Sequence, residues 1–212
     1  MEPKFMISEV FQTSWKHTKS QIWVLAGLLI GFCILSLILE LLGMPAQGST
    51  AGKIIVSLIS ILISSIFALG YTKNMFQTLD GEEPQFSAYG QQSRKAITYF
   101  VANFIYAILV LLGLALLIIP GIYIGIRLQF YSAFIVEENC GIIDSLQKSW
   151  KLTQGQAMPL FLLALTMLGI SIIGIILFFI GIFIAIPLVS MMQCYVFRKL
   201  NTVSIETVQI EL

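Results

Sequence analysis

The sequence predicts an all-α integral membrane protein in which six transmembrane helices form three hairpins, each preceded by an amphipathic helix at the cytoplasmic interface. Only 11% of the 212 residues are charged and 58% are hydrophobic, whereas about a quarter of the residues of a soluble domain are charged. The mean hydropathy is +0.92. Because a helix needs about 20 apolar residues to cross a bilayer, and several uncharged runs reach that length, lipid is the expected solvent for most of the chain.

The apolar runs fall into three pairs, and the residues between the members of each pair favour a turn. The pairs are residues 22–43 with 54–71, 97–119 with 122–136, and 159–179 with 182–197. The first link carries Pro45, Gly48 and Gly52, the second is Pro120-Gly121, and the third surrounds Gly181. Each pair therefore predicts a helical hairpin.

The first apolar run reads as a retained span. It is longer than the roughly 7 to 15 residues of the apolar part of a signal peptide, and it begins only after an amphipathic segment of about 20 residues.

The basic residues predict the orientation, because cationic loops stay on the cytoplasmic side. With the N-terminus inside, only Lys53 falls outside, and Arg127 is counted on neither side because it lies within a span. The cytoplasmic set is then Lys4, Lys16, Lys19, Lys73, Arg94, Lys95, Lys148, Lys151, Arg198 and Lys199. This bias predicts that both termini lie in the cytoplasm.

An internal repeat supports the pairing. Residues 12–16, 91–95 and 147–151 share the pattern Q-x-S-x-K, and each lies shortly before a hairpin. We therefore expect one domain, residues 1–200, built from units at about 5–79, 84–138 and 140–199. Since each unit has an even number of spans, the repeats are parallel and their amphipathic helices lie on one side, unlike the inverted repeats of many transporters.

Two of the predicted amphipathic helices carry an apolar stripe with a tryptophan beside lysines. Ile7, Phe11 and Trp15 are spaced by four, as are Ile142, Leu146 and Trp150, so each stripe lies on one helical face. The lysines beside them are Lys16, Lys19, Lys148 and Lys151. A tryptophan flanked by ammonium groups suits the headgroup layer. The alternative is that the stripes dock on the cytoplasmic ends of the bundle.

The segment after Leu200 changes character. Val203, Ile205 and Val208 alternate with polar residues at a period closer to that of a strand than of a helix. We expect residues 201–212 to form a loosely ordered cytoplasmic tail.

Arg127 and Glu40 are the charged groups of most interest, because an ionised group within a span is costly and usually pairs or faces water. Arg127 lies about 9 Å and Glu40 about 5 Å below the outer ends of their helices at 1.5 Å per residue. The hypothesis is that they form a structural salt bridge or line an outward-facing polar pocket for a headgroup phosphate. A snorkelling Arg127 is the plainer interpretation.

Other polar residues predict no recognisable catalytic site. Glu137 and Glu138 are adjacent at a helix end, where they point about 100° apart and do not converge on one substrate atom. The three cysteines lack metal-ligand spacing, so neither a metal site, a disulfide framework nor a cofactor is expected. Motifs of soluble hydrolases, proteases and nucleotide-binding enzymes are absent. The net charge of +1 with scattered cations disfavours nucleic-acid binding.

Several motifs resemble a group of bacterial multi-spanning proteins that includes the membrane domain of some glycerophosphoryl diester phosphodiesterases. They are residues 119–123 (IPGIY), Arg127, Glu137-Glu138 and residues 144–155, with residues 70–71 and 80–86 as a weaker match. The resemblance covers nearly the whole chain and is strongest over residues 120–155. It implies a six-span bundle in a bacterial cytoplasmic (inner) membrane without an established activity, and no phosphodiesterase domain is expected in this chain.

The sequence therefore predicts a non-enzymatic membrane protein that binds lipids or a soluble protein partner as a scaffold in envelope homeostasis. A small transporter or flippase with Arg127 and Glu40 in a polar cavity is the rival prediction, and an intramembrane enzyme acting on a lipid is the third. A transporter requires a cavity containing Arg127, whereas a scaffold requires a cytoplasmic surface around Trp15 and Trp150.

Overall fold

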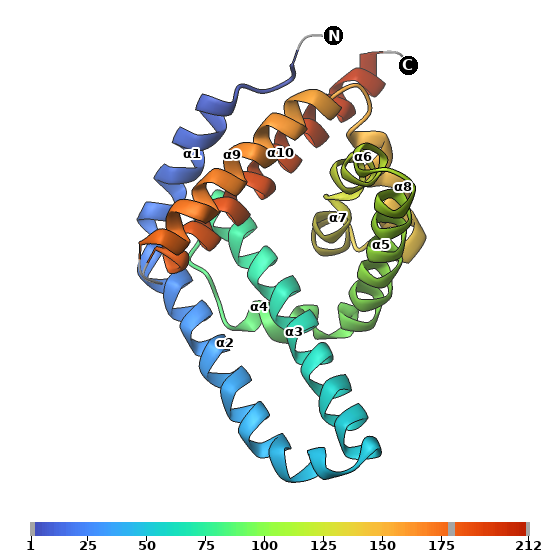
Figure 1. The fold of residues 1–212 in the computed structure, drawn as a ribbon. Coiled ribbons are helices and arrows are strands. Elements are labelled where there is room, and N and C mark those ends of the chain that lie inside the picture. The colour runs from blue at the N-terminus through green and yellow to red at the C-terminus, as the bar shows by residue number, and fades with distance from the viewer. Residues whose placement is uncertain (1–2, 178–180, 211–212) are drawn as a thin grey trace.

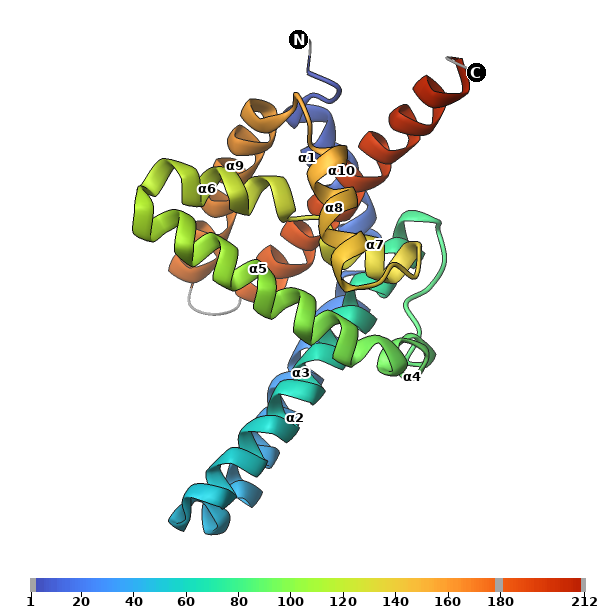
Figure 2. The ribbon, with the colours of Figure 1, turned by 90° about the vertical axis from the view of Figure 1, so that its right-hand side faces the viewer.

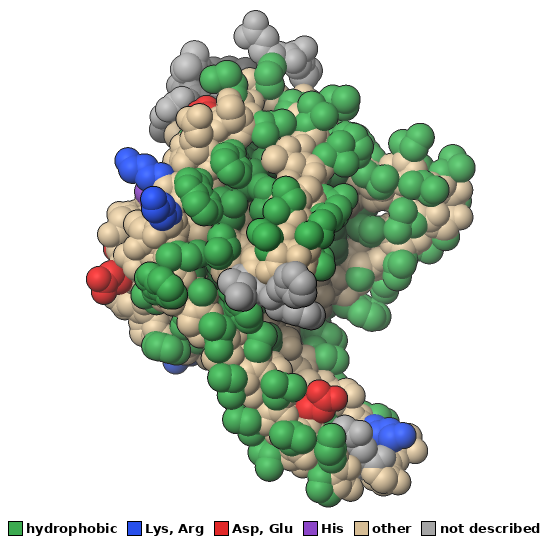
Figure 3. Space-filling model, turned by 60° about the vertical axis from the view of Figure 1, so that its left-hand side comes forward, with side chains coloured by type: hydrophobic (Ala, Val, Ile, Leu, Met, Phe, Trp, Pro, Cys, Tyr) green, Lys and Arg blue, Asp and Glu red, His purple; other side chains and the backbone are tan. Residues whose placement is uncertain are grey.

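The computed structural model describes residues 3–177 and 181–210, and at residues 46–47 and 203–210 it describes the backbone alone. Every described element is a helix (Figure 1). Six helices are long and apolar enough to cross a membrane: Ile22–Gly43, Thr50–Leu79, Ser87–Leu116, Ile118–Glu137, Ala157–Ile176 and Ile182–Thr202. The prediction of six membrane-length helices is confirmed. Figure 3 shows hydrophobic side chains over much of the surface, as expected of a multi-pass membrane protein.

Helices α2 and α3 form an elongated pair that projects away from the other helices (Figures 1 and 2). Helix α1 (Ile7–Ser20) precedes α2 (Ile22–Gly43), and η1 (Met44–Gly48) connects α2 to α3 (Thr50–Leu79). The Ser49 hydroxyl caps α3 by accepting a hydrogen bond from Gly52 N–H at 3.0 Å. The two helices meet closely near the tip, because a Cβ added at Gly43 would lie 2.7 Å from Val56 Cγ1.

The second pair turns earlier than predicted. Helix α4 (Ser87–Gln92) and η2 (Ser93–Lys95) lead directly into α5 (Ala96–Leu116), and the chain reverses at Leu117 before α6 (Ile118–Leu128). The prediction that Pro120-Gly121 forms the turn is therefore wrong. Proline is tolerated in the first turn of a helix, where its missing N–H has no helical partner to lose.

The predicted span 122–136 is interrupted rather than continuous. Helix α6 ends at Leu128 and α7 (Tyr131–Glu137) begins after Gln129 and Phe130. Ser149 of α8 (Ile142–Leu152) fills the break, since its hydroxyl accepts from Phe130 N–H at 3.1 Å and donates to the Arg127 carbonyl at 3.0 Å. A side chain from another helix therefore satisfies the backbone groups that the break leaves unpaired.

The third pair consists of α9 (Ala157–Ile176) and α10 (Ile182–Ile210). Phe179, in the predicted turn, lies outside the described residues, as do the last two residues of the predicted tail. The expectation of a loosely ordered tail is wrong as far as Ile210, because α10 continues to that residue. Extending an existing helix adds one hydrogen bond per residue without a new nucleation cost, which outweighs a weak strand-like pattern.

The helices that precede each pair pack against the second helix of a different pair. Helix α8 lies on α6 and α7, α4 and η2 lie on α3, and α1 lies on α10. The centre of the bundle contains four buried rings, those of Phe76, Phe130, Phe134 and Phe197. The centroid of the Phe197 ring lies 4.9 to 6.0 Å from the centroids of the other three rings. This aromatic cluster joins α3, α7 and α10 just below a charged end of the molecule.

Candidate functional site

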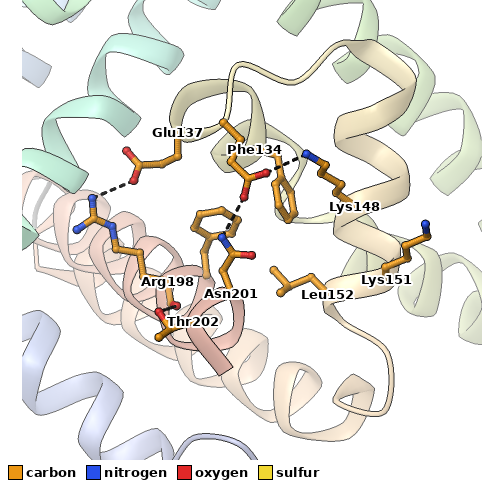
Figure 4. Close-up of a pocket in the computed structure, with 10 residues that line it drawn as sticks. Phe134, Glu137, Lys148, Lys151, Leu152, Arg198, Asn201 and Thr202 are labelled. Atoms are coloured by element: carbon orange, nitrogen blue, oxygen red, sulfur yellow. Dashed lines mark hydrogen bonds and ion pairs between the residues drawn. The ribbon is translucent and has the colours of Figure 1, made fainter. Parts of the chain in front are cut away.

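A cavity of about 800 Å³ lies between α7, α8 and α10 (Figure 4). It combines an apolar floor with a charged wall. Its lining residues are Phe134, Glu137, Glu138, Lys148, Lys151, Leu152, Phe197, Arg198, Asn201 and Thr202.

The floor is apolar and buried. Phe134 and Phe197 pack edge to face with ring centroids 4.9 Å apart, and both are buried, as is Leu152. Edge-to-face packing is a favoured arrangement for aromatic pairs. The floor therefore places apolar side chains beneath the charged groups.

The charged wall contains three ion pairs with the adjacent glutamates, two to Glu137 and one to Glu138. Glu137 accepts from Arg198 at 2.9 Å and lies 3.4 Å from the Lys73 ammonium. Glu138 accepts from Lys148 at 2.9 Å and from the Asn201 side-chain amide at 3.0 Å. The two carboxylates thus diverge, as expected for neighbours on a helix, and each is held by its own cation.

Lys151 supplies a cation in excess of the carboxylates. Three basic side chains and two carboxylates line the cavity, and Lys148 and Lys151 are three residues apart, which places them on one side of α8. Within the part of the chain that the structure describes, the Lys151 ammonium makes no hydrogen bond or ion pair. Figure 4 shows its side chain at the rim, directed away from the ion pairs.

The ion pairs keep the wall charged at neutral pH. The hydrogen bond from Lys148 to Glu138 raises the pKa of the Lys148 ammonium. Beside the cavity, the Arg198 guanidinium also binds Asp80 and lowers the pKa of that carboxyl group. The cavity can therefore offer fixed ammonium and guanidinium groups to an anion over an apolar floor.

Arg127 does not line this cavity and is engaged with the end of α8. Its guanidinium donates to the Trp150 carbonyl at 2.6 Å and to the Thr153 carbonyl at 3.1 Å. It also lies 4.5 Å from the centroid of the Trp150 ring, and only 4% of the residue is exposed. A cation at the C-terminus of a helix is favoured by the unpaired carbonyl groups there, so Arg127 has a structural position.

Glu40 and Arg127 are not brought together. Glu40 lies in a groove between α2 and α3 with Ser57, Ser60 and other residues of that pair, whereas the groups bound by Arg127 belong to α8 and the turn after it. The predicted salt bridge between them is wrong. The depth argument failed because the first and second pairs point in different directions, so similar depths do not bring the two residues together (Figure 2).

The predicted interfacial residues keep their outer faces free. Trp15 is 41% and Trp150 40% exposed, and Lys16 and Lys19 are exposed on α1. The buried face of α1 is instead formed by Val10, Ser14 and Thr18, so this helix docks through small residues and leaves its aromatic stripe uncovered.

Sequence reasoning missed the contributions of Asn201, Thr202 and the aromatic floor. The polar pair falls in the segment that was expected to be a tail, and Phe134 and Phe197 resemble any other apolar residue of a span. One sequence signal could have indicated the site. Lys148 and Lys151 lie on one face of α8, opposite the helix ends that carry Glu137, Glu138 and Arg198.

The comparisons with known proteins give a family without an assigned activity. Uncharacterized protein Mb2590 of Mycobacterium bovis is 31% identical over 101 residues, which are 48% of this chain and 31% of that protein. Uncharacterized protein Rv2560 of Mycobacterium tuberculosis is 32% identical over 90 residues, which are 42% of this chain and 28% of that protein. The chain thus spans about a third of the length of the curated relatives it matches.

None of these matches links the chain to phosphodiesterases, so that part of the resemblance stays a prediction. No solved structure matches the chain. Residues 88–210, more than half of the chain, match the family model described as a domain of unknown function, DUF7847. The protein therefore belongs to the DUF7847 family.

Proposed function

We propose that the protein is a non-enzymatic membrane scaffold that binds the phosphate-bearing headgroup of an anionic phospholipid in the cavity between α7, α8 and α10. The observation that carries the proposal is the excess cation: Lys151 adds an unpaired ammonium at the rim of a cavity in which Lys148 and Arg198 are already paired with carboxylates. The floor beneath these groups is formed by Phe134 and Phe197. A phosphodiester has one negative charge, and its attached glycerol and acyl chains suit an adjoining apolar surface.

The position of α8 supports access from the headgroup layer. Trp150 remains partly exposed on the same helix as Lys148 and Lys151. Such a combination of an exposed aromatic ring and lysines is typical of helices that lie in a membrane interface. We propose that α1, α4 with η2, and α8 lie at the cytoplasmic interface, and that the three helix pairs enter the membrane of a bacterium from that side.

Two features support the proposed repeat of three units. Each preceding helix packs on the second helix of another pair, α8 on α6 and α7, α4 on α3, and α1 on α10. In addition, Ser14 and Thr18 of α1 are fully buried, like Ser149 and Thr153 at the matching positions of the third unit. The middle unit departs from this pattern, because Ser93, at the matching position of its motif, is exposed.

The transporter alternative is less well supported. It requires a polar cavity containing Arg127 and Glu40, but Arg127 is held against α8 and Glu40 lies between α2 and α3. A headgroup-binding scaffold requires no continuous pathway across the bundle.

The proposal is tested by native mass spectrometry of the full chain released from nanodiscs of phosphatidylcholine and phosphatidylglycerol. Lys151→Glu replaces the excess cation by an acid, and we expect phosphatidylglycerol retention to fall about fivefold or more, because a basic residue near a membrane surface contributes about 1 kcal/mol. Lys19→Glu, an exposed lysine of α1 outside the cavity, is the matched control: it shares any general loss of surface attraction, so the proposal predicts a larger loss of phosphatidylglycerol in Lys151→Glu than in Lys19→Glu. Equal retention by the wild type and Lys151→Glu would exclude the cavity as the binding site.

A further inference from the structure

A second polar groove lies between α2 and α3, inside helices that are otherwise apolar. It has a volume of about 530 Å³ and contains Glu40 together with four serines. The serines are Ser36, Ser57, Ser60 and Ser64. Figure 3 shows this pair as a hydrophobic projection interrupted by acidic and basic side chains near its tip.

The helical spacing brings these polar groups to facing sides of the two helices. Ser36 and Glu40 are four residues apart on α2, and Ser57, Ser60 and Ser64 are separated by three and four residues on α3, so each set lies on one face. The groove therefore places one carboxylate opposite a row of hydroxyl groups.

The hydroxyl groups of the groove differ from others in the membrane-length helices. Ser65, Thr72 and Thr166 each donate to the backbone carbonyl four residues earlier, at 2.8 to 2.9 Å, as is usual for such residues in apolar helices. Among the described residues, the side chains of the four groove serines and of Glu40 make no hydrogen bond or ion pair. Glu40, Ser57 and Ser64 are exposed and the other two serines are half-buried, so a ligand that enters the groove can reach all five side chains.

We propose that this groove binds a primary ammonium group. An ionised carboxylate within a span is costly unless a cation pairs with it. An ammonium has three N–H donors and no acceptor, so it can bind the Glu40 carboxylate and two hydroxyl oxygens at once. The volume far exceeds that of a bare monovalent ion and lies in the range of pockets for small organic ligands.

The neighbouring Lys53 favours an ammonium that is accompanied by a phosphate. Lys53 lies four residues before Ser57, and therefore on the same face of α3, nearer to the tip. An aminophospholipid headgroup carries both charges, on its ammonium and its phosphate. A free alkylamine offers the same ammonium without the phosphate.

The test compares full-length wild type, Glu40→Gln and Glu40→Asp in nanodiscs of phosphatidylcholine with either phosphatidylethanolamine or phosphatidylglycerol. Native mass spectrometry counts the lipids that stay bound, and the unfolding temperature checks that each variant is folded. Because the removed contact is a charge-assisted hydrogen bond, Glu40→Gln is expected to lower phosphatidylethanolamine retention about tenfold. Glu40→Asp keeps the carboxylate and is expected to retain most of it.

Two further arms identify the source of the ammonium and separate this site from the cavity on α8. If the groove accepts any primary ammonium, added ethanolamine releases phosphatidylethanolamine. If the phosphate is also required, phosphatidylethanolamine stays bound. Both results support the ammonium site. Lys151→Glu is expected to change phosphatidylglycerol retention alone. Undiminished phosphatidylethanolamine retention by Glu40→Gln overturns the inference. A wild-type dimer that Glu40→Gln converts to a monomer also overturns it, because a second copy of the chain would then occupy the groove.

Discussion

Arg127 binds Trp150 twice, donating a hydrogen bond to its backbone carbonyl at 2.6 Å and lying 4.5 Å from the centroid of its ring. The Thr153 hydroxyl completes the junction by donating to the Arg127 carbonyl at 3.0 Å. The break between α6 and α7 and the end of α8 therefore satisfy each other's unpaired backbone groups.

Replacing Arg127 is expected to destabilise the bundle. Arg127→Met removes two hydrogen bonds from a charged donor and leaves carbonyl groups unpaired, which should cost about 3 kcal/mol. The measurement is thermal unfolding in detergent. Arg94→Met, at an exposed arginine, is the matched control. Equal unfolding temperatures for the two variants would show that the junction is not stabilising.

The ion pairs that hold α10 to α1 and α3 predict a loss of stability in acid. A hydrogen bond from Lys199 lowers the pKa of Glu9, and one from Arg198 lowers the pKa of Asp80. A carboxyl group whose pKa is lower in the folded state stabilises the fold above its ordinary pKa, and this stabilisation is lost as the pH falls through the lowered value.

The unfolding temperature should therefore begin to fall when the pH drops to about 4, near the ordinary pKa values of carboxyl groups. It should continue to fall at lower pH, as the carboxyl groups with lowered pKa values become protonated. Each pair is partly exposed and should contribute about 1 kcal/mol or less. The double variant Glu9→Gln with Asp80→Asn should show a weaker dependence on pH over this interval. An identical pH profile for wild type and double variant would contradict the assignment.

The close contact of α5 with α6 depends on glycine at a specific position. A Cβ at Gly113 would lie 2.8 Å from Gly121 Cα, whereas a Cβ at Gly125 would have its nearest neighbour at 3.6 Å. Gly113→Ala is expected to destabilise the protein by about 1 to 3 kcal/mol through overpacking. Gly125→Ala should be tolerated, and thermal unfolding distinguishes the two.

The orientation predicted from the basic residues can be tested by labelling. In a background with Cys33, Cys140 and Cys194 replaced by serine, Lys53→Cys should react with an impermeant maleimide in intact cells. Lys19→Cys should react only after the cells are permeabilised. The reverse pattern would place the termini and the α8 cavity on the outer side.

Local sequence signals were sufficient for the membrane-length helices and insufficient for their junctions. Apolar run length alone predicts α2, α5 and α9, because lipid imposes the same requirement on each helix. The break at Gln129 and Phe130 was not predictable, since it depends on Ser149 from a helix that follows in the chain. Pro120 indicated a turn by its usual preference, but the first turn of a helix accommodates it equally well.

The candidate site was predictable in part. Lys148 and Lys151 were identified from their place beside Trp150, and both line the cavity. For Glu137 and Glu138 the sequence predicted only that the side chains diverge at a helix end, yet Glu137 forms ion pairs with Lys73 and Arg198, and Glu138 forms one with Lys148. Such partners are determined by tertiary packing, which cannot be predicted from the helical periodicity of the sequence.

The most direct test of headgroup binding is the electron density of the protein crystallised from a lipid phase containing phosphatidylglycerol. The proposal predicts phosphate density within hydrogen-bonding distance of the Lys151 and Lys148 ammonium groups, with the acyl chains leading away over Phe134 and Phe197. A cavity filled by protein side chains or by water alone, with phosphatidylglycerol bound elsewhere on the bundle, would contradict it.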